Sequence, residues 1–147
     1  MIQRIQTVYI LLAGILTATL FKLRLADLTA NNELMEFYAK GIFKGEEAVF
    51  NGLPLLVFIG IITLLHLVTL FLYKKRILQI RVLVFTIILL LGLFGLFFYF
   101  TYMGFEGAKV AFKIPVVFPL VVVILDWLAI RAIGKDEALI RSLNRIR

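Results

Sequence analysis

Four long runs of this chain carry almost no charge, and this separation of charged from apolar sequence limits the possible folds more than any other feature. The runs are Thr7–Phe21, Gly52–Tyr73, Val82–Phe105 and Ile114–Ile130, and Asp126 is the one charged residue within them. The 147-residue chain is 63% hydrophobic and 17% charged, whereas soluble domains are typically about 45–50% apolar and about 25% charged. A soluble globular fold, a disordered chain and a barrel of alternating strands are therefore excluded.

The lengths of these runs fit helices that cross a membrane. An α-helix rises about 1.5 Å per residue, so about 20 residues cross a hydrocarbon core of about 30 Å. We predict an all-α membrane protein, an antiparallel four-helix transmembrane bundle with spans at about 5–22, 52–73, 82–105 and 114–133. The whole chain, 1–147, is expected to form a single integral membrane domain.

The first apolar run could be mistaken for a cleaved signal peptide, because the basic residue Arg4 precedes it. Lys22 and Arg24 follow the run directly, in place of the small residues that a signal peptidase requires. We therefore expect this run to be a retained first helix.

Two segments outside the predicted spans are long enough to carry structure. The external loop 22–51 is too short for an independent core. We expect it to contain either a small hairpin within Leu34–Gly45, resting on the helix ends, or a short interfacial helix through Asn32–Lys40. In the cytoplasmic tail 134–147, apolar residues recur at helical spacing and predict an amphipathic helix; they are Leu139, Leu143 and Ile146.

The distribution of Lys and Arg predicts the orientation, because cytoplasmic segments of membrane proteins carry an excess of these residues. With both termini inside, ten of the 16 basic residues are cytoplasmic: Arg4, Lys74, Lys75, Arg76, Arg81, Arg131, Lys135, Arg141, Arg145 and Arg147. We predict a multi-pass protein of the bacterial inner (cytoplasmic) membrane with both termini in the cytoplasm. The net charge of +7 then reflects topology, and no nucleic-acid partner is expected.

Two ionisable residues, His66 and Asp126, lie inside predicted spans, where such groups usually face the protein interior. In the predicted orientation they lie at similar depth, so a hydrogen bond between them is geometrically allowed and would lower the cost of burying each. Alternatively, Asp126 extends toward Arg131 or the basic turn, and His66 bonds a backbone carbonyl or Thr63. A structural role and a proton-relay or ligand role both stay open for these intramembrane polar candidates.

No other pattern indicates catalysis or a cofactor. The chain has no cysteine and a single histidine, which excludes thiol chemistry, thiolate metal sites and a bis-histidine haem. It also lacks a phosphate-binding glycine loop and a nucleophile elbow. We expect no enzymatic activity, no catalytic residue, no cofactor and no metal.

Three stretches of the sequence resemble a known family. They are Met1–Tyr9, the turn Leu72–Arg81 and the tail Lys135–Arg147. On these residues the chain resembles a family of small bacterial membrane proteins, typical of Bacteroidota, that is catalogued as domain of unknown function 4293. The resemblance covers essentially the whole chain and implies an inner-membrane, four-helix protein, but it supplies no activity, substrate or catalytic residue. All three stretches are cytoplasmic in the predicted orientation, which favours a role on that side.

The sequence therefore points to a basic cytoplasmic face, formed by Lys74, Lys75, Arg76, Arg81, Arg141 and Arg145. We expect a non-enzymatic accessory or assembly subunit that binds membrane lipids or a larger membrane protein complex through this face. The alternative is a small homo-oligomeric transporter or channel with Asp126 and His66 near its pathway. A transporter predicts a hydrated cavity that reaches Asp126, whereas a subunit predicts a dry interior.

Overall fold

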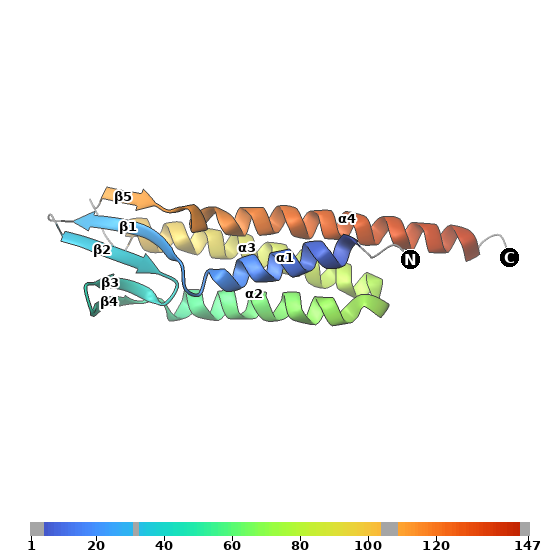
Figure 1. Cartoon of the computed structure of the whole chain (residues 1–147), viewed down its shortest axis with the longest axis horizontal. Helices are drawn as coiled ribbons and strands as arrows, with labels where there is room; N and C mark the ends of the chain where they lie inside the picture. Colours follow the sequence, from blue (N-terminus) through green and yellow to red (C-terminus); the bar gives the residue numbers. More distant parts are fainter. Residues whose placement is uncertain (1–4, 31–32, 104–108, 145–147) are drawn as a thin grey trace.

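The structure is a computed structural model that describes residues 5–30, 33–103 and 109–144. Four α-helices run along its long axis, and a β-sheet covers one end of them (Figure 1). The helices are α1 (Ile5–Thr19), α2 (Leu53–Phe71), α3 (Arg76–Met103) and α4 (Phe118–Asn144). Two short 3₁₀ helices, η1 (Leu72–Lys74) and η2 (Ile114–Val117), precede α3 and α4. The strands are β1 (Arg24–Ala30), β2 (Glu33–Tyr38), β3 (Gly41–Lys44), β4 (Glu47–Asn51) and β5 (Lys109–Phe112).

Three helical segments of the described chain are long and apolar enough to cross a membrane, which indicates a membrane protein. They are Leu53–Lys74, Arg76–Tyr102 and Ile114–Ile140, with mean hydropathy of 2.7, 2.7 and 2.3. The first predicted span, 5–22, is a shorter apolar helix, because α1 ends at Thr19 after 15 residues.

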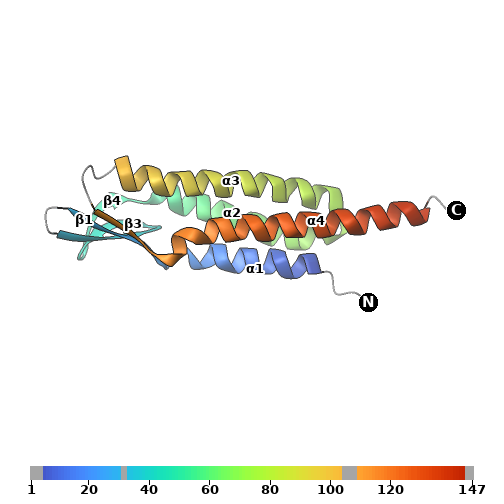
Figure 2. The same ribbon diagram turned by 90° about the horizontal axis from the view of Figure 1, so that it is seen from above.

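The helices pack in a ring in which each contacts two neighbours. α1 lies against α2 and α4, and α3 lies against the same two helices (Figure 2). α2 and α4 therefore occupy opposite corners of the ring. Any side-chain contact between α2 and α4 must cross its centre.

The predicted all-α, antiparallel four-helix bundle is wrong, because the chain also forms a five-stranded antiparallel sheet. The strand order is β4-β3-β2-β1-β5. The four strands β1–β4 come from the predicted external loop 22–51, and β5 comes from the connection between α3 and α4. The expected hairpin within Leu34–Gly45 is present as β2 and β3, as one part of this larger sheet. The alternative helix through Asn32–Lys40 is absent from the described residues, since Glu33–Tyr38 is strand.

The sheet forms because it does not need a core of its own. Along β2 the side chains alternate, and those of Met35 and Phe37 are buried. The Phe37 ring meets Phe97 of α3 edge-on, with ring centroids 6.4 Å apart. Phe37, Ile42 of β3 and Ile59 of α2 belong to one continuous apolar cluster. The helices thus supply the apolar surface that an isolated hairpin would lack.

Two glycines, Gly41 and Gly52, lie close together where the sheet joins α2. Gly41 has φ +144°, and a Cβ atom there would lie 2.2 Å from the carbonyl oxygen of Phe50. The amide of Gly52 donates a hydrogen bond to the Lys40 carbonyl at 3.0 Å. A Cβ atom at Gly52 would lie 2.4 Å from the Ala39 carbonyl oxygen. Backbone therefore packs directly on backbone at this junction.

The predicted span 114–133 and the predicted tail helix 134–147 belong to one helix in the structure. α4 continues without a break from Phe118 to Asn144. Its final turns extend beyond the other three helices (Figure 1). Of the predicted apolar face of the tail, Ile146 lies outside the described residues.

Candidate functional site: a basic cleft and a buried His–Asp pair

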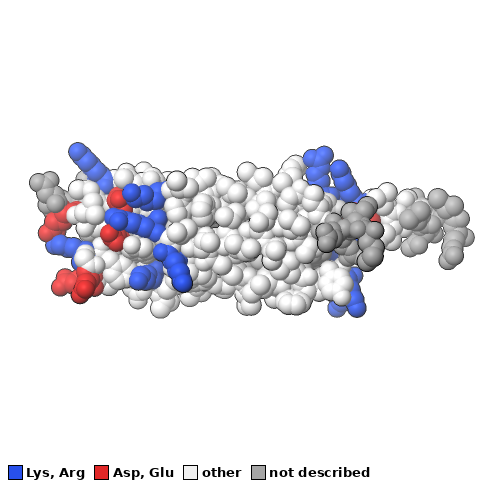
Figure 3. All heavy atoms as spheres, viewed as in Figure 1, with Lys and Arg blue, Asp and Glu red and all other residues white. Residues whose placement is uncertain are grey.

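The charges of the described chain gather at the two ends of the molecule, on either side of an uncharged band (Figure 3). At the sheet end, basic and acidic residues are interspersed and pair with each other. Arg24 pairs with Asp27 and, at 2.8 Å, with Glu36. Lys113 pairs with Asp27 at 3.0 Å. These ion pairs neutralise the sheet end locally.

The opposite end carries basic residues without such partners. Lys74, Lys75, Arg76 and Arg81 lie in and just after the turn between α2 and α3. Among the described residues, none of these four side chains forms an ion pair with an Asp or Glu. Within the described residues, no ion pair therefore offsets the charge of these four side chains, unlike the paired charges at the sheet end.

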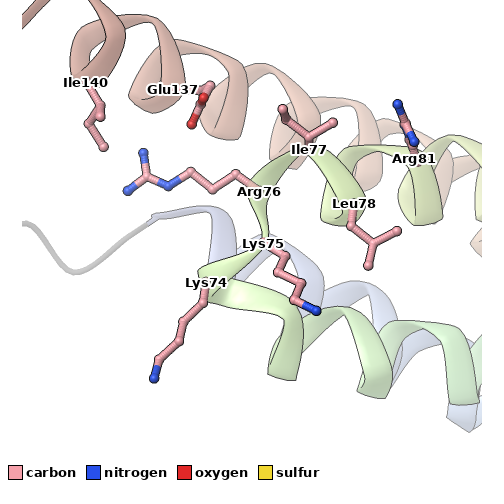
Figure 4. Close-up of a pocket in the computed structure, with 8 residues that line it drawn as sticks. All are labelled: Lys74, Lys75, Arg76, Ile77, Leu78, Arg81, Glu137 and Ile140. Atoms are coloured by element: carbon pink, nitrogen blue, oxygen red, sulfur yellow. The ribbon is translucent and has the colours of Figure 1, made fainter. Parts of the chain in front are cut away.

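These four basic residues line a cavity of about 580 Å³, which we call the basic cleft (Figure 4). The remaining lining residues are Ile77 and Leu78 of α3 with Glu137 and Ile140 of α4. Figure 4 shows the Arg76 side chain reaching toward α4, beside Glu137 and Ile140, while Lys74 and Lys75 extend outward from the turn. The cleft is thus formed where the last turns of α4 pass the turn between α2 and α3.

Local hydrogen bonds hold the turn that carries the basic residues. The Lys75 amide donates to the Leu72 carbonyl at 2.9 Å, and the Gln79 amide donates to the Lys75 carbonyl at 2.9 Å, so α3 begins directly at Arg76. The buried Gln79 side chain donates through Nε2 to the carbonyl of Thr69 at 3.1 Å, which ties the start of α3 to the end of α2. The first amide groups of a helix have no acceptor within that helix, so the amino end of a helix favours anions. The basic side chains stand beside the amino end of α3.

Arg76 is the least exposed of the four. Its Nη1 atom is buried and has no hydrogen-bond partner among the described residues. A buried guanidinium donor without an acceptor is costly, so this atom is a ready donor for an oxygen ligand.

Two members of the predicted basic face are not placed in the cleft. Arg141 lies in α4, but its side chain is not among those the structure describes, and Arg145 lies outside the described residues. Glu137 and Ile140, which sequence reasoning did not assign to the site, line it instead.

The two intramembrane polar candidates, His66 and Asp126, are brought together. His66 Nε2 lies 3.1 Å from Asp126 Oδ1 and 3.3 Å from Oδ2, and the two side chains are 1% and 0% exposed. His66 Nδ1 lies 2.9 Å from the carbonyl oxygen of Ile62. A carbonyl only accepts hydrogen bonds, so Nδ1 carries a proton and donates it there. The contact with Asp126 must then hold a further proton, carried either by Nε2 or by the carboxyl group.

This His–Asp pair crosses the ring of helices from α2 to α4. One of the alternatives is also present, because His66 bonds the Ile62 carbonyl as well as Asp126. The Thr63 hydroxyl instead donates to the Ile59 carbonyl at 2.8 Å. α1 passes close to the pair at Gly14, where a Cβ atom would lie 3.3 Å from the His66 Cβ. The pair therefore joins α2 directly to α4, and α1 packs against His66.

His66 also borders a groove of about 250 Å³ between α1 and α2. The other lining residues are almost all apolar: Ile10, Leu11, Gly14, Ile15, Ala18, Thr63, Leu67 and Leu70. Asp126 does not line this groove. In the part of the chain that the structure describes, no group of three or more His, Cys, Asp or Glu side chains is arranged to hold a metal ion.

Sequence reasoning missed two buried amides, Gln6 and Gln79, which are 1% and 2% exposed. Gln6 shares the buried face of α1 with Ile10, Ala13 and Thr17. The spacing of Gln6 from these residues in the sequence could have predicted that its side chain is buried. Both polar atoms of the Gln6 side chain are without a hydrogen-bond partner among the described residues.

Comparison with known proteins yields a family and nothing more specific. No curated protein and no solved structure matches the chain. A family model described as "Domain of unknown function (DUF4293)" matches residues 2–146, essentially the whole sequence, and the expected link to Bacteroidota stays a prediction. The chain therefore belongs to the DUF4293 family.

Proposed function

We propose that the protein is a small, non-enzymatic subunit of the bacterial inner membrane. It binds lipid or a larger membrane complex through the basic cleft, together with Arg141 and Arg145 of the predicted basic face. The observation that carries this proposal is the contrast between the two ends of the molecule. Arg24, Lys44 and Lys113 at the sheet end are paired with acidic residues. The four basic residues of the cleft are left to attract an anionic partner.

The proposal includes an orientation in which the cleft and both termini face the cytoplasm. This orientation follows from the excess of Lys and Arg at the end that carries the cleft. The sheet would then lie outside, where its mixed charges are tolerated.

Cysteine labelling tests this orientation, since the chain has no cysteine that would interfere. In intact cells, a membrane-impermeant maleimide is expected to label a Glu46→Cys variant at the sheet end. A Lys75→Cys variant should react only after the cells are permeabilised. Both native side chains are exposed, so access alone does not distinguish them. The reverse pattern would contradict the orientation.

A partner of the basic face should be captured by crosslinking in cells, followed by purification in mild detergent and mass spectrometry. We expect the yield of the same crosslinked partner to fall by about a hundredfold when Lys74, Lys75 and Arg76 are replaced together by glutamine, since each basic residue near an anionic surface contributes about 1 kcal/mol. The matched control replaces Lys22, Lys40 and Lys44 at the sheet end, which removes the same charge. If the protein is recovered alone, with neither lipid nor protein retained, the proposal fails.

The transporter alternative has no observation that favours it. Asp126 is fully buried between helices, and the groove that His66 borders is lined almost entirely by apolar side chains. A transport pathway is normally lined by several polar groups around a water-filled space.

A further inference from the structure

We propose that the basic cleft binds the phosphate headgroup of one anionic phospholipid. This inference rests on the proposed function, and it names the ligand of the same site. Three properties of the cleft support it: its position along the molecule, the charges that line it and the apolar residues beside them.

The position of the cleft places it at the level of lipid headgroups. Lys74 and Arg76 stand at the ends of Leu53–Lys74 and Arg76–Tyr102, two segments long enough to cross a membrane. A segment of 22 residues extends about 33 Å as a helix, slightly more than a hydrocarbon core of about 30 Å. A turn between two such helices must lie in the headgroup layer, where phosphate is the most abundant anion.

The charged lining matches a phosphate group. Four cations against the single carboxylate of Glu137 leave the cleft strongly positive. Arg76 offers the buried Nη1 donor, which has no acceptor in the described part of the chain, and guanidinium groups bind phosphate oxygens through paired hydrogen bonds. Lys74 and Lys75 have flexible stems, so their ammonium groups can turn from their outward positions in Figure 4 toward a bound anion.

The apolar lining distinguishes a lipid from a free anion. Ile77, Leu78 and Ile140 border the same cavity and are 49%, 42% and 41% exposed. A soluble phosphate would leave these side chains uncovered. The glycerol and first methylene groups of a phospholipid would cover them, and such burial is worth about 25 cal/mol per Å² of apolar surface. The volume of about 580 Å³ is also within the usual range of ligand sites.

Lipid retention by the purified full-length protein tests the inference. The protein in mild detergent is mixed with phosphatidylglycerol or phosphatidylcholine, and native mass spectrometry counts the lipids that stay bound. We expect one phosphatidylglycerol to be retained in preference to phosphatidylcholine. Lys75→Gln/Arg76→Gln should weaken this retention by about tenfold or more.

The matched control is Arg131→Gln/Lys135→Gln. These two residues lie on α4 and border a different cavity, together with Ile5 and Tyr9. The control removes one Arg and one Lys, as the test variant does, and it should leave retention unchanged.

The outcomes separate the inference from the proposed function. If both double variants lose phosphatidylglycerol equally, the basic end attracts anionic lipid in general and the cleft is not a specific site. If neither variant loses it, the cleft inference is wrong, and a lost protein crosslink would then be the remaining support for the proposed function. If millimolar inorganic phosphate displaces the lipid completely, the cleft binds a free anion, and the lipid assignment is overturned.

A second measurement covers the case in which the test variant does not fold. A photoreactive phosphatidylglycerol analogue is crosslinked to the unaltered protein, and the modified peptide is identified. Modification within 72–81 or 135–140 is expected. Modification confined to α1 or to the sheet would contradict the inference.

Discussion

Replacing Gly41 by alanine is expected to destabilise the protein by roughly 3 kcal/mol. The new Cβ atom would lie 2.2 Å from the Phe50 carbonyl oxygen, and the φ of +144° is one that residues with a Cβ rarely adopt. Neither side can easily move, because Gly41 pairs with Tyr38 on one side and with Asn51 on the other. Unfolding in detergent, followed by circular dichroism, measures the loss.

Two other glycines serve as controls for this prediction. Gly45 has φ +62°, but a Cβ atom there would have no neighbour within 4 Å, so its replacement by alanine should cost only about 1 kcal/mol. Gly95 lies within α3 and has the same open space around it, so alanine there should be neutral or slightly stabilising. An effect of Gly41→Ala no larger than that of Gly95→Ala would show that backbone contact does not limit this junction.

Replacing His66 by alanine is the second large effect, expected to cost about 3–5 kcal/mol. The substitution leaves the fully buried Asp126 without its partner and opens a cavity between α1, α2 and α4. Asp126→Asn should cost much less, because the amide nitrogen can donate to His66 Nε2 while Nδ1 keeps its bond to the Ile62 carbonyl. Adding Asp126→Asn to His66→Ala should recover on the order of 1 kcal/mol, since the unpartnered group is then uncharged.

The same variants decide whether the His–Asp pair does more than join helices. With a structural role, growth and crosslinked partners should follow stability, so Asp126→Asn would leave both unchanged. Loss of growth in Asp126→Asn with unchanged unfolding would instead indicate that the proton held between His66 and Asp126 is used. Equal stability of all three variants and the unaltered protein would contradict the predicted cost of breaking the pair.

Two of the helices were predictable because the length and apolar character of a run act locally. Gly52–Tyr73 and Val82–Phe105 predict α2 and α3 closely, since nothing in those runs favours another structure. The short α1 has the same composition, but it ends at Thr19, before the sheet begins at Arg24. Run length alone did not reveal that a strand follows so soon.

The sheet was missed because its stability depends on distant parts of the chain. The loop 22–51 is indeed too short for a core of its own, but Phe37 packs on Phe97, far away in the sequence. Lys109–Phe112 is four residues long and mostly exposed, so no local periodicity marks it as a strand. Only its pairing with β1 makes it one.

The site was predictable where its residues lie on predicted helices or follow one another in the sequence. His66 and Asp126 could be placed at one depth by counting along two helices of the same direction, and the structure brings them within hydrogen-bond distance. The basic residues Lys74, Lys75 and Arg76 are consecutive in the sequence, so their grouping was also predictable. Glu137 and Ile140 join the cleft because α4 continues past residue 133 and passes the turn between α2 and α3, which the sequence pattern does not show.

The order of strands in the sheet has a consequence for how the protein is made. β1 pairs with β2 on one side and with β5 on the other, and α2 and α3 lie between β1 and β5 in the sequence. During synthesis, the edge of β1 that will pair with β5 therefore stays unpaired while α2 and α3 enter the bilayer. The sheet can therefore be completed only after α2 and α3 have been synthesised.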